Sequence, residues 1–184
     1  NTIEPWCYDA TRDNIRHYAH GIGDDNPLWC DPAYARSTKY GDIIALPSFL
    51  FATSRIISGY VGGLAGVHAM WSGADWTWHQ PIRRNTEVRT EAWLKDLVEH
   101  DTRFAGRAIQ QIYHVNFYDA ATGDCLAEAD SWCFRTDRDH AREKGTKYSE
   151  VKDRPHRVYT DEEIQSYFRY YEDEEIRGAD TRYW

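Results

Sequence analysis

Acidic and amide side chains are concentrated in one short stretch, residues 23–32, which holds Asp24, Asn26 and Asp31 together with two prolines. A positioned carboxylate can act as a general base that takes a proton from water. Asp and Asn also satisfy the backbone amides of turns, so the spacing alone leaves both interpretations open. Cys30 lies in the same stretch without a base at a recognisable spacing, and we therefore expect a buried thiol rather than a nucleophile.

A basic pair, Arg83 and Arg84, follows Pro81 in an expected turn. Guanidinium groups bind phosphate bidentately, so the pair could contact a phosphate. An ordinary solvated turn is an equally good interpretation of the same residues. Three tryptophans, Trp71, Trp76 and Trp78, follow one another on one expected strand, where core packing is favoured over the wall of a large apolar pocket.

Metal and cofactor sites are not expected. His20, Asp24 and Asp31 show no metal-ligand pattern, and the four cysteines form no CxxC pair. The remaining candidate imidazoles are interpreted as strand or core residues unless the fold brings one of them to Asp24; they are His68, His79 and His114.

Composition limits the class of partner. The 184 residues carry a net charge of −8, which argues against nucleic acid and anionic membranes, because both select basic surfaces. No apolar run reaches the length of a membrane span, and the start of the chain has no signal-peptide layout. We expect reduced thiols, a cytoplasmic location and, since no initiator Met is present, residues missing before Asn1.

Helical periodicity precedes a series of strands. Thr11 can cap a short helix that ends at Gly21, and Pro47 can open a second, buried helix that runs to about Tyr60 and is stopped by Gly62 and Gly63. Four strands are then predicted at 68–79, 86–97, 106–118 and 125–135, the last two joined by a hairpin turn at 119–124. This order predicts an α+β fold in which an antiparallel sheet wraps around one helix.

The composition changes after Arg135. We predict one domain over residues 1–136 and an appendage over 137–184, which begins as a charged loop. Thr160 and Glu163 form a capping-box pair in front of a helix that contains Ile164 and Phe168.

The acidic stretch resembles the signature of the MaoC-like hydratase/dehydratase family: Asp, any residue, Asn-Pro, an apolar residue, His, any residue, Asp. Asp24, Asn26, Pro27, Leu28 and Asp31 match it. Trp29 stands where the family has its catalytic His. Further stretches that resemble N-terminal-type members are 40–49, 66–73, 81–83 and 103–107, and residues 177–184 resemble a junction to a second domain of the same kind.

This resemblance implies a hot-dog fold and the addition of water to a 2-enoyl thioester, or the reverse reaction on a 3-hydroxyacyl thioester. It implies catalytic roles for Asp24 and Asn26, while indole cannot replace the imidazole as acid or base. Substrate contacts are expected at the start of the buried helix, where the Leu46 backbone could donate a hydrogen bond, and at the basic turn, which could contact coenzyme A. The expected substrate-binding residues are Trp29, Asp31, Leu46, Pro47, Arg83 and Arg84.

We therefore expect a substrate-binding half of a hydratase whose catalytic His comes from a second hot-dog unit. Two alternatives stay open: a catalytically silent scaffold or acyl-binding half, and a hot-dog thioesterase, for which no nucleophile or helix carboxylate is evident. The expected partners are an acyl thioester and another hot-dog unit, either a second copy or a different subunit or domain.

Overall fold

The computed structural model describes residues 4–60, 62–103, 106–139 and 155–173. The chain divides into two compact units, Asn1–Lys147 and Tyr148–Trp184. The predicted boundary at residue 136, and the role of 137–184 as a linker to a second domain, stay predictions. The expected charged loop falls mostly, and the expected junction at 177–184 entirely, outside the described residues.

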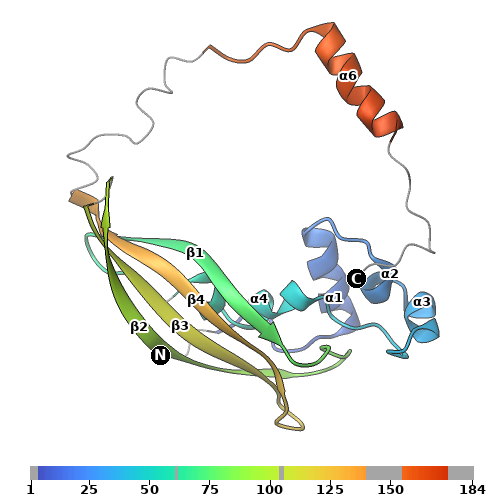
Figure 1. Ribbon diagram of the computed structural model, residues 1–184. Helices are drawn as coiled ribbons and strands as arrows, with labels where there is room; N and C mark the ends of the chain where they lie inside the picture. Colours follow the sequence, from blue (N-terminus) through green and yellow to red (C-terminus); the bar gives the residue numbers. More distant parts are fainter. Residues whose placement is uncertain (1–3, 61, 104–105, 140–154, 174–184) are drawn as a thin grey trace. The chain divides into compact units, whose positions relative to one another are not determined.

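The first unit is built on one four-stranded antiparallel sheet in the order β1-β4-β3-β2 (Figure 1). Its strands are β1 Val67–Trp78, β2 Val88–Thr102, β3 Gly106–Asp119 and β4 Cys125–Asp137. All four predicted strands are confirmed. The hairpin between β3 and β4 closes with Gly123 N–H donating to the Asp119 carbonyl at 2.8 Å, and Gly123 has the positive φ of 79° that such a turn favours.

The predicted single helix over 47–60 is wrong in its continuity. The structure has three short pieces instead: η1 Pro47–Phe49, α4 Leu50–Thr53 and η2 Ile56–Ser58. Ser54 is extended at φ −152° and ψ 127°, and the Ala52 carbonyl accepts from Trp6 N–H and Cys7 N–H at 3.0 and 3.1 Å. A tertiary contact with the start of the chain therefore takes the acceptor that a continuous helix would have used.

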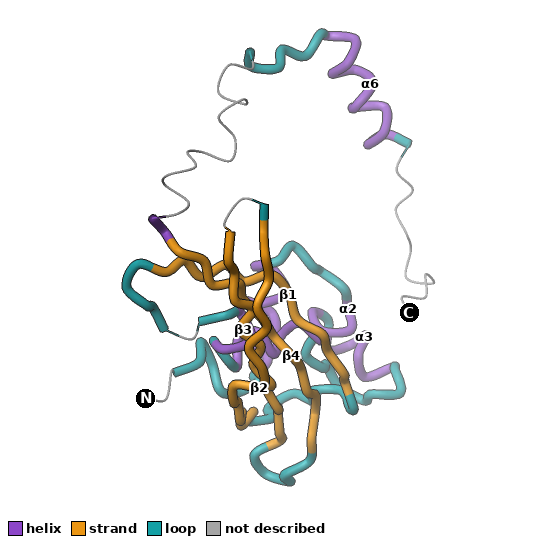
Figure 2. The backbone as a smooth tube through the Cα atoms, turned by 60° about the vertical axis from the view of Figure 1, so that its left-hand side comes forward, coloured by secondary structure: helices purple, strands orange, loops and turns teal. Residues whose placement is uncertain are grey.

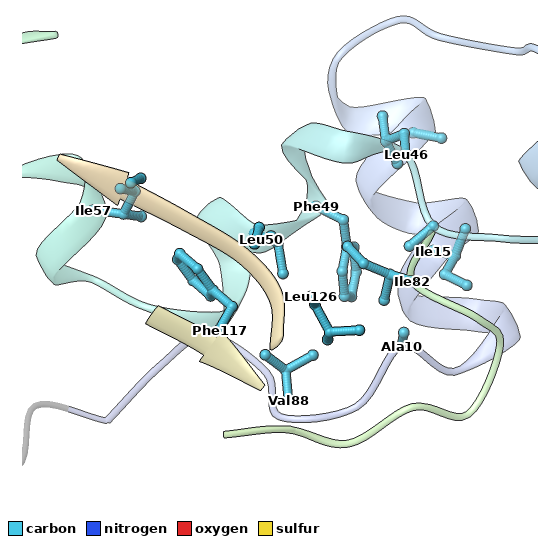
Figure 3. Close-up of a cluster of buried hydrophobic side chains, with 14 of the residues drawn as sticks. Ala10, Ile15, Leu46, Phe49, Leu50, Ile57, Ile82, Val88, Phe117 and Leu126 are labelled. Carbon is cyan, nitrogen blue, oxygen red and sulfur yellow. The ribbon is translucent and has the colours of Figure 1, made fainter. Parts of the chain in front are cut away.

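Burial of the segment is as predicted, although its helical geometry is not. Phe49, Leu50 and Ile57 are fully buried, and α4 lies on the concave side of the curved sheet (Figure 1). Figure 2 shows helical turns of this unit beside the strands from a second direction. Figure 3 shows the resulting core, in which Phe49 and Leu50 meet Leu126 and Phe117 from the sheet. The predicted α+β hot-dog arrangement, a sheet wrapped around a central helical segment, is confirmed.

Three helices precede this core. The predicted first helix is α1 Arg12–Gly21, and Thr11 caps it by accepting from Asn14 N–H at 3.2 Å. The polar stretch 23–32 contains α2 Pro27–Cys30 and leads into α3 Pro32–Ser37. Each proline occupies the first turn of its helix, where its missing N–H costs nothing, which explains how so polar a segment becomes helical.

The second unit contains α6 Asp161–Glu172. Its capping box is confirmed: Glu163 N–H donates to Thr160 Oγ1 at 3.2 Å, and Thr160 N–H donates to Glu163 Oε2 at 3.0 Å. Over the described residues of both units, no helix has the length and apolar character needed to cross a membrane.

Candidate active site

The loop after α1 positions the motif residues through local hydrogen bonds. Gly23, at φ 74°, turns the chain out of α1, and Asp24 N–H donates to the Ala19 carbonyl at 2.9 Å. Asp24 Oδ1 then accepts from Asn26 N–H at 3.0 Å, and Asn26 Oδ1 accepts from Leu28 N–H at 2.9 Å as the cap of α2. Both side chains therefore build the turn in which they sit, which is the structural role expected of Asp and Asn.

Asp31 also acts as a helix cap. Its Oδ1 accepts from Ala33 N–H at 2.7 Å and from Tyr34 N–H at 3.3 Å at the start of α3, and the residue is exposed. Asp24 differs from Asp31 in being half-buried, and Oδ2 of either carboxylate has no hydrogen-bond partner within the described part of the chain. Each carboxylate therefore keeps one oxygen that can accept a further hydrogen bond.

Trp29 occupies the position of the family's imidazole. The side chain is half-buried against the hydrophobic core, and its Nε1 is buried without a hydrogen-bond partner. No imidazole nitrogen of the described residues lies within 4.0 Å of the Asp24 carboxylate. Because an indole nitrogen carries no basic lone pair, this loop does not contain an acid–base pair.

The start of the broken helix lies beside this loop. Tyr18 of α1 donates its hydroxyl hydrogen to the Ser48 carbonyl at 2.7 Å, and Trp78 Nε1 donates to the Pro47 carbonyl at 3.4 Å. Leu46 is 2% exposed and has extended backbone angles, and its N–H makes no hydrogen bond within the described chain. The structure thus brings Leu46 and Pro47 close to α1, while nothing in it tests their binding of substrate.

The basic turn is joined to the same region by backbone. Ile44 and Arg83 form an isolated antiparallel bridge, and Ala45 N–H donates to the Ile82 carbonyl at 2.8 Å. Arg84 Nη2 lies 2.7 Å from Asp42 Oδ2, with both side chains more than a third exposed. Arg83 Nη1 donates to the Tyr40 carbonyl at 3.2 Å and has no carboxylate within 4.0 Å among the described residues. One of the two positive charges is therefore uncompensated.

Cys30 does not have the environment of a nucleophile. Burial first, and then the negative charges of Asp24 and Asp25, raise the pKa of its thiol above the usual value of 9.0. A raised pKa keeps the group protonated at neutral pH, although Cys30 is half-buried rather than buried as predicted. The described residues contain no cluster of three or more His, Cys, Asp or Glu side chains that could hold a metal ion.

Sequence inspection missed a polar cluster on the face of the sheet opposite the core. His114 Nδ1 lies 2.7 Å from Asp130 Oδ1, its Nε2 lies 2.9 Å from Asn116 Oδ1, and its ring packs on Trp93 with centroids 4.6 Å apart. Lys95 of β2 forms an ion pair with Asp130 of β4, across the intervening strand β3. The signal in the sequence was that Trp93, His114 and Asp130 alternate with core residues along their strands, which places them on the face opposite the core. His114 is thereby committed to Asp130 and does not replace the imidazole missing beside Asp24.

Comparisons with known proteins agree with this fold. Residues 1–122 match the protein-family model described as "FAS1-like, dehydratase domain region". A UPF0336 protein of Streptomyces avermitilis is 31% identical over 102 residues, which are 51% of this chain and 68% of that protein.

Two solved structures are similar at low identity. The ChsH1-ChsH2 complex from Mycobacterium tuberculosis has a TM-score of 0.59 at 20% identity and covers 73% of this chain and 82% of that one. The (R)-hydratase of A. caviae involved in PHA biosynthesis has a TM-score of 0.53 at 18% identity and covers 72% and 97%. At these identities the two structures support the hot-dog fold.

The family match extends over the whole of α1 to β3, so it includes the Asp24 loop, the broken helix and the basic turn together. This chain therefore belongs to the family described as FAS1-like, dehydratase domain region, and it carries Trp29 at the position where the signature that it resembles has His.

Proposed function

We propose that this chain is the substrate-binding half of a hydratase/dehydratase that acts on 2-enoyl and 3-hydroxyacyl thioesters, with the catalytic His supplied by a second hot-dog unit. The observation that carries the proposal is the pairing of a half-buried Asp24, whose Oδ2 has no partner among the described residues, with Trp29 in the position of the imidazole. Membership of the dehydratase family supplies the reaction class.

Hydration of an enoyl thioester needs a base that deprotonates water, an acid that protonates the α carbon and a donor for the enolate oxygen. Asp24 Oδ2 orients the water, and Asn26 holds Asp24 in place through its backbone N–H. The N–H of Leu46 is the candidate donor to the thioester oxygen. Trp29 and Pro47 provide apolar surface, and Asp31 shapes the loop as the cap of α3. The proton transfers need the imidazole of the second unit.

The basic turn contributes to coenzyme A binding in this proposal. Arg83 has an uncompensated charge and meets a phosphate of the nucleotide, while Arg84 is held in place by Asp42 and adds a second positive group. The antiparallel bridge between Ile44 and Arg83 keeps this turn at a constant position relative to Leu46. When the thioester carbonyl lies at Leu46, the coenzyme A part of the substrate would therefore extend toward the two arginines.

A second unit is supported by the sheet. β1 and β2 are the edge strands, with 12 and 15 residues, and edges of this length favour association with another strand. The structural neighbour ChsH1-ChsH2 is itself a complex of two chains. The proposal places the assembly in the cytoplasm, where thiols such as those of the four free cysteines stay reduced.

The decisive experiment measures hydration of a panel of enoyl-CoA substrates by the isolated chain, by a hot-dog protein encoded beside it, and by the two together. We expect turnover only in the mixture, and an Asp24→Asn variant lowers that turnover by about 10²-fold. Asn retains Oδ1, so the hydrogen bond from Asn26 N–H and the turn are preserved. Robust turnover by the isolated chain would show that another group replaces the His.

A catalytically silent scaffold is the second candidate. It is favoured by the use of Asp24, Asn26 and Asp31 as acceptors for nearby backbone amides, because these bonds explain all three residues without catalysis. The same mixture distinguishes the candidates. If Asp24→Asn leaves turnover unchanged while removal of the chain abolishes it, the chain acts as a scaffold.

A further inference from the structure

A cavity lies at the end of the sheet away from Pro47, where β1 and β3 begin and β2 and β4 end. Its volume is about 660 Å³, and its walls include Leu64, Leu97, Ile109 and Arg135. Arg135 lies four residues after Ser131 on β4, and Ser131 donates to the Ile57 carbonyl of the broken helix. Since alternate residues of a strand share a face, Arg135 projects from the concave face of the sheet. We call this space the Arg135 cavity.

The charge of Arg135 is buried and unbalanced. The residue is 8% exposed, and its Nε donates to Gln111 Oε1 at 2.9 Å while its Nη2 donates to the Gly62 carbonyl at 3.2 Å. Both acceptors are neutral, and Nη1 is buried with no hydrogen-bond partner in the described part of the chain. No carboxylate of the described residues lies within 4.0 Å of the guanidinium. A buried cation in these surroundings is costly unless an anion compensates it.

Other charges on the cavity wall do not provide that compensation. Arg107 is already engaged in a two-pronged ion pair with Glu99, at 2.7 and 2.9 Å. Asp137 and Asp139 are exposed at the rim, and Asp137 Oδ1 accepts from Asp139 N–H. The uncompensated group of the cavity is therefore Arg135.

The remaining wall is apolar and comes from several elements. Leu64 and Val67 approach from the start of β1, Leu97 from β2 and Ile109 from β3. A ligand that satisfies both parts of the wall has an apolar body and a terminal carboxylate. Guanidinium and carboxylate form paired hydrogen bonds in a matching planar geometry, which a hydroxyl or an amide cannot reproduce.

We propose that the Arg135 cavity binds an aliphatic carboxylate, with the carboxylate on the guanidinium and the chain against Leu64, Val67, Leu97 and Ile109. Nη1 is covered by protein atoms, so the ligand engages it after a rotation of the guanidinium that breaks the longer bond, to the Gly62 carbonyl. Free carboxylic acids and acyl thioesters with a second, distal carboxylate share this chemistry. The site is separate from the Asp24 loop and does not depend on hydration activity.

Isothermal titration of the full chain at pH 7.5 tests the proposal with three probes: decanoate, decanol and acetate. Decanoate should bind at least about tenfold more tightly than decanol, a difference of about 1.4 kcal/mol, and acetate should bind more weakly than decanoate. Equal affinities for decanoate and decanol would overturn the proposal, and this comparison needs no variant. Decanedioyl-CoA against decanoyl-CoA then distinguishes the two sources: a gain for the diacid derivative alone indicates the distal carboxylate of a thioester, and binding of decanoate alone indicates the free acid.

Two variants assign the binding to Arg135. Arg135→Gln should abolish the preference for decanoate, and Arg135→Lys should retain part of it. Arg107→Gln is the matched control, because it removes a guanidinium of the same cavity that Glu99 already neutralises. Circular dichroism confirms folding of each variant. Unchanged decanoate affinity in a folded Arg135→Gln variant, or an equal loss in Arg107→Gln, would show that Arg135 does not bind the carboxylate and has only a structural role through its hydrogen bond to the Gly62 carbonyl.

Discussion

Tyr18 and Ser48, 30 residues apart, are joined by a hydrogen bond of 2.7 Å from the tyrosine hydroxyl to the serine carbonyl. The Tyr18 ring also packs edge-on against Phe49, with centroids 5.6 Å apart. This contact connects α1, which leads into the Asp24 loop, with the first turn of the broken helix. Tyr18, which lies outside the family motif, is therefore one of the side chains that hold the segment leading to Asp24 against the segment that follows Leu46.

Tyr18→Phe should lower the free energy of unfolding by about 1 kcal/mol, because the ring contact stays and a partly buried hydrogen bond is lost. Chemical denaturation measures the change. Tyr8→Phe is a suitable control, since Tyr8 is 49% exposed and no hydrogen bond of its hydroxyl is found within the described chain. Equal effects of the two substitutions would show that the Tyr18 bond does not stabilise the fold.

Gly73 lies opposite Trp132 at the bulge of β1, where a Cβ atom would be 2.7 Å from Trp132 Cζ2. Gly73→Ala should therefore destabilise the fold by about 1–3 kcal/mol through overpacking, seen as a lower thermal midpoint. At Gly63 a Cβ atom meets nothing within 4 Å and φ is not positive, so Gly63→Ala should have a much smaller effect. A Gly73→Ala protein as stable as the Gly63→Ala protein would contradict this.

Asp130 should contribute acid-sensitive stability. Burial raises the pKa of its carboxyl group, but hydrogen bonds from Lys95 and His114 outweigh burial and hold the pKa below the usual value of 3.8. A lowered pKa in the folded state means that the carboxylate stabilises the fold above the unfolded-state pKa, and that this contribution is lost as pH falls through the folded-state pKa.

The corresponding variant is Asp130→Asn. It should be less stable than the parent by about 1–2 kcal/mol at pH 7, and the difference should shrink below about pH 4. Denaturation at several pH values between 7 and 3 measures it. Asp75→Asn, at the position opposite Asp130 on β1, is the control, because Asp75 has no cationic group within 4.0 Å among the described residues. A difference that is constant with pH would exclude the ion pairs as its source.

Arg83→Ala should raise the KM of the assembled enzyme for an enoyl-CoA by about tenfold, because one uncompensated phosphate partner is lost. The KM for the matching N-acetylcysteamine thioester, which has no phosphates, should change little. Steady-state kinetics with both substrates compare the two. Equal increases would indicate that Arg83 acts only through its bond to the Tyr40 carbonyl.

The elements that depend on local physics were predictable from the chain. Alternation of apolar and polar residues along β3 predicted a strand with one face on the core, because the period of two is a property of the strand itself. Thr11, and Thr160 with Glu163, marked helix starts for the same reason, since a cap involves neighbours within one turn. The family signature around Asp24 and its departure at Trp29 are contiguous in sequence, so both could be recognised without a structure. The predicted reaction class followed from that resemblance.

The remainder depends on partners that are distant in sequence. The expected helix is broken at the Ala52 carbonyl because Trp6 and Cys7 donate to it, and Arg84 is neutralised by Asp42, which is distant from it in sequence. The unbalanced charge of Arg135 emerges only when Gln111, Gly62 and the apolar walls enclose it. Helical periodicity and charge runs carry no information on which N–H group donates to a given carbonyl, or on whether a guanidinium meets a carboxylate. Both outcomes depend on competition among contacts between residues distant in sequence, and only the tertiary structure determines which contacts form.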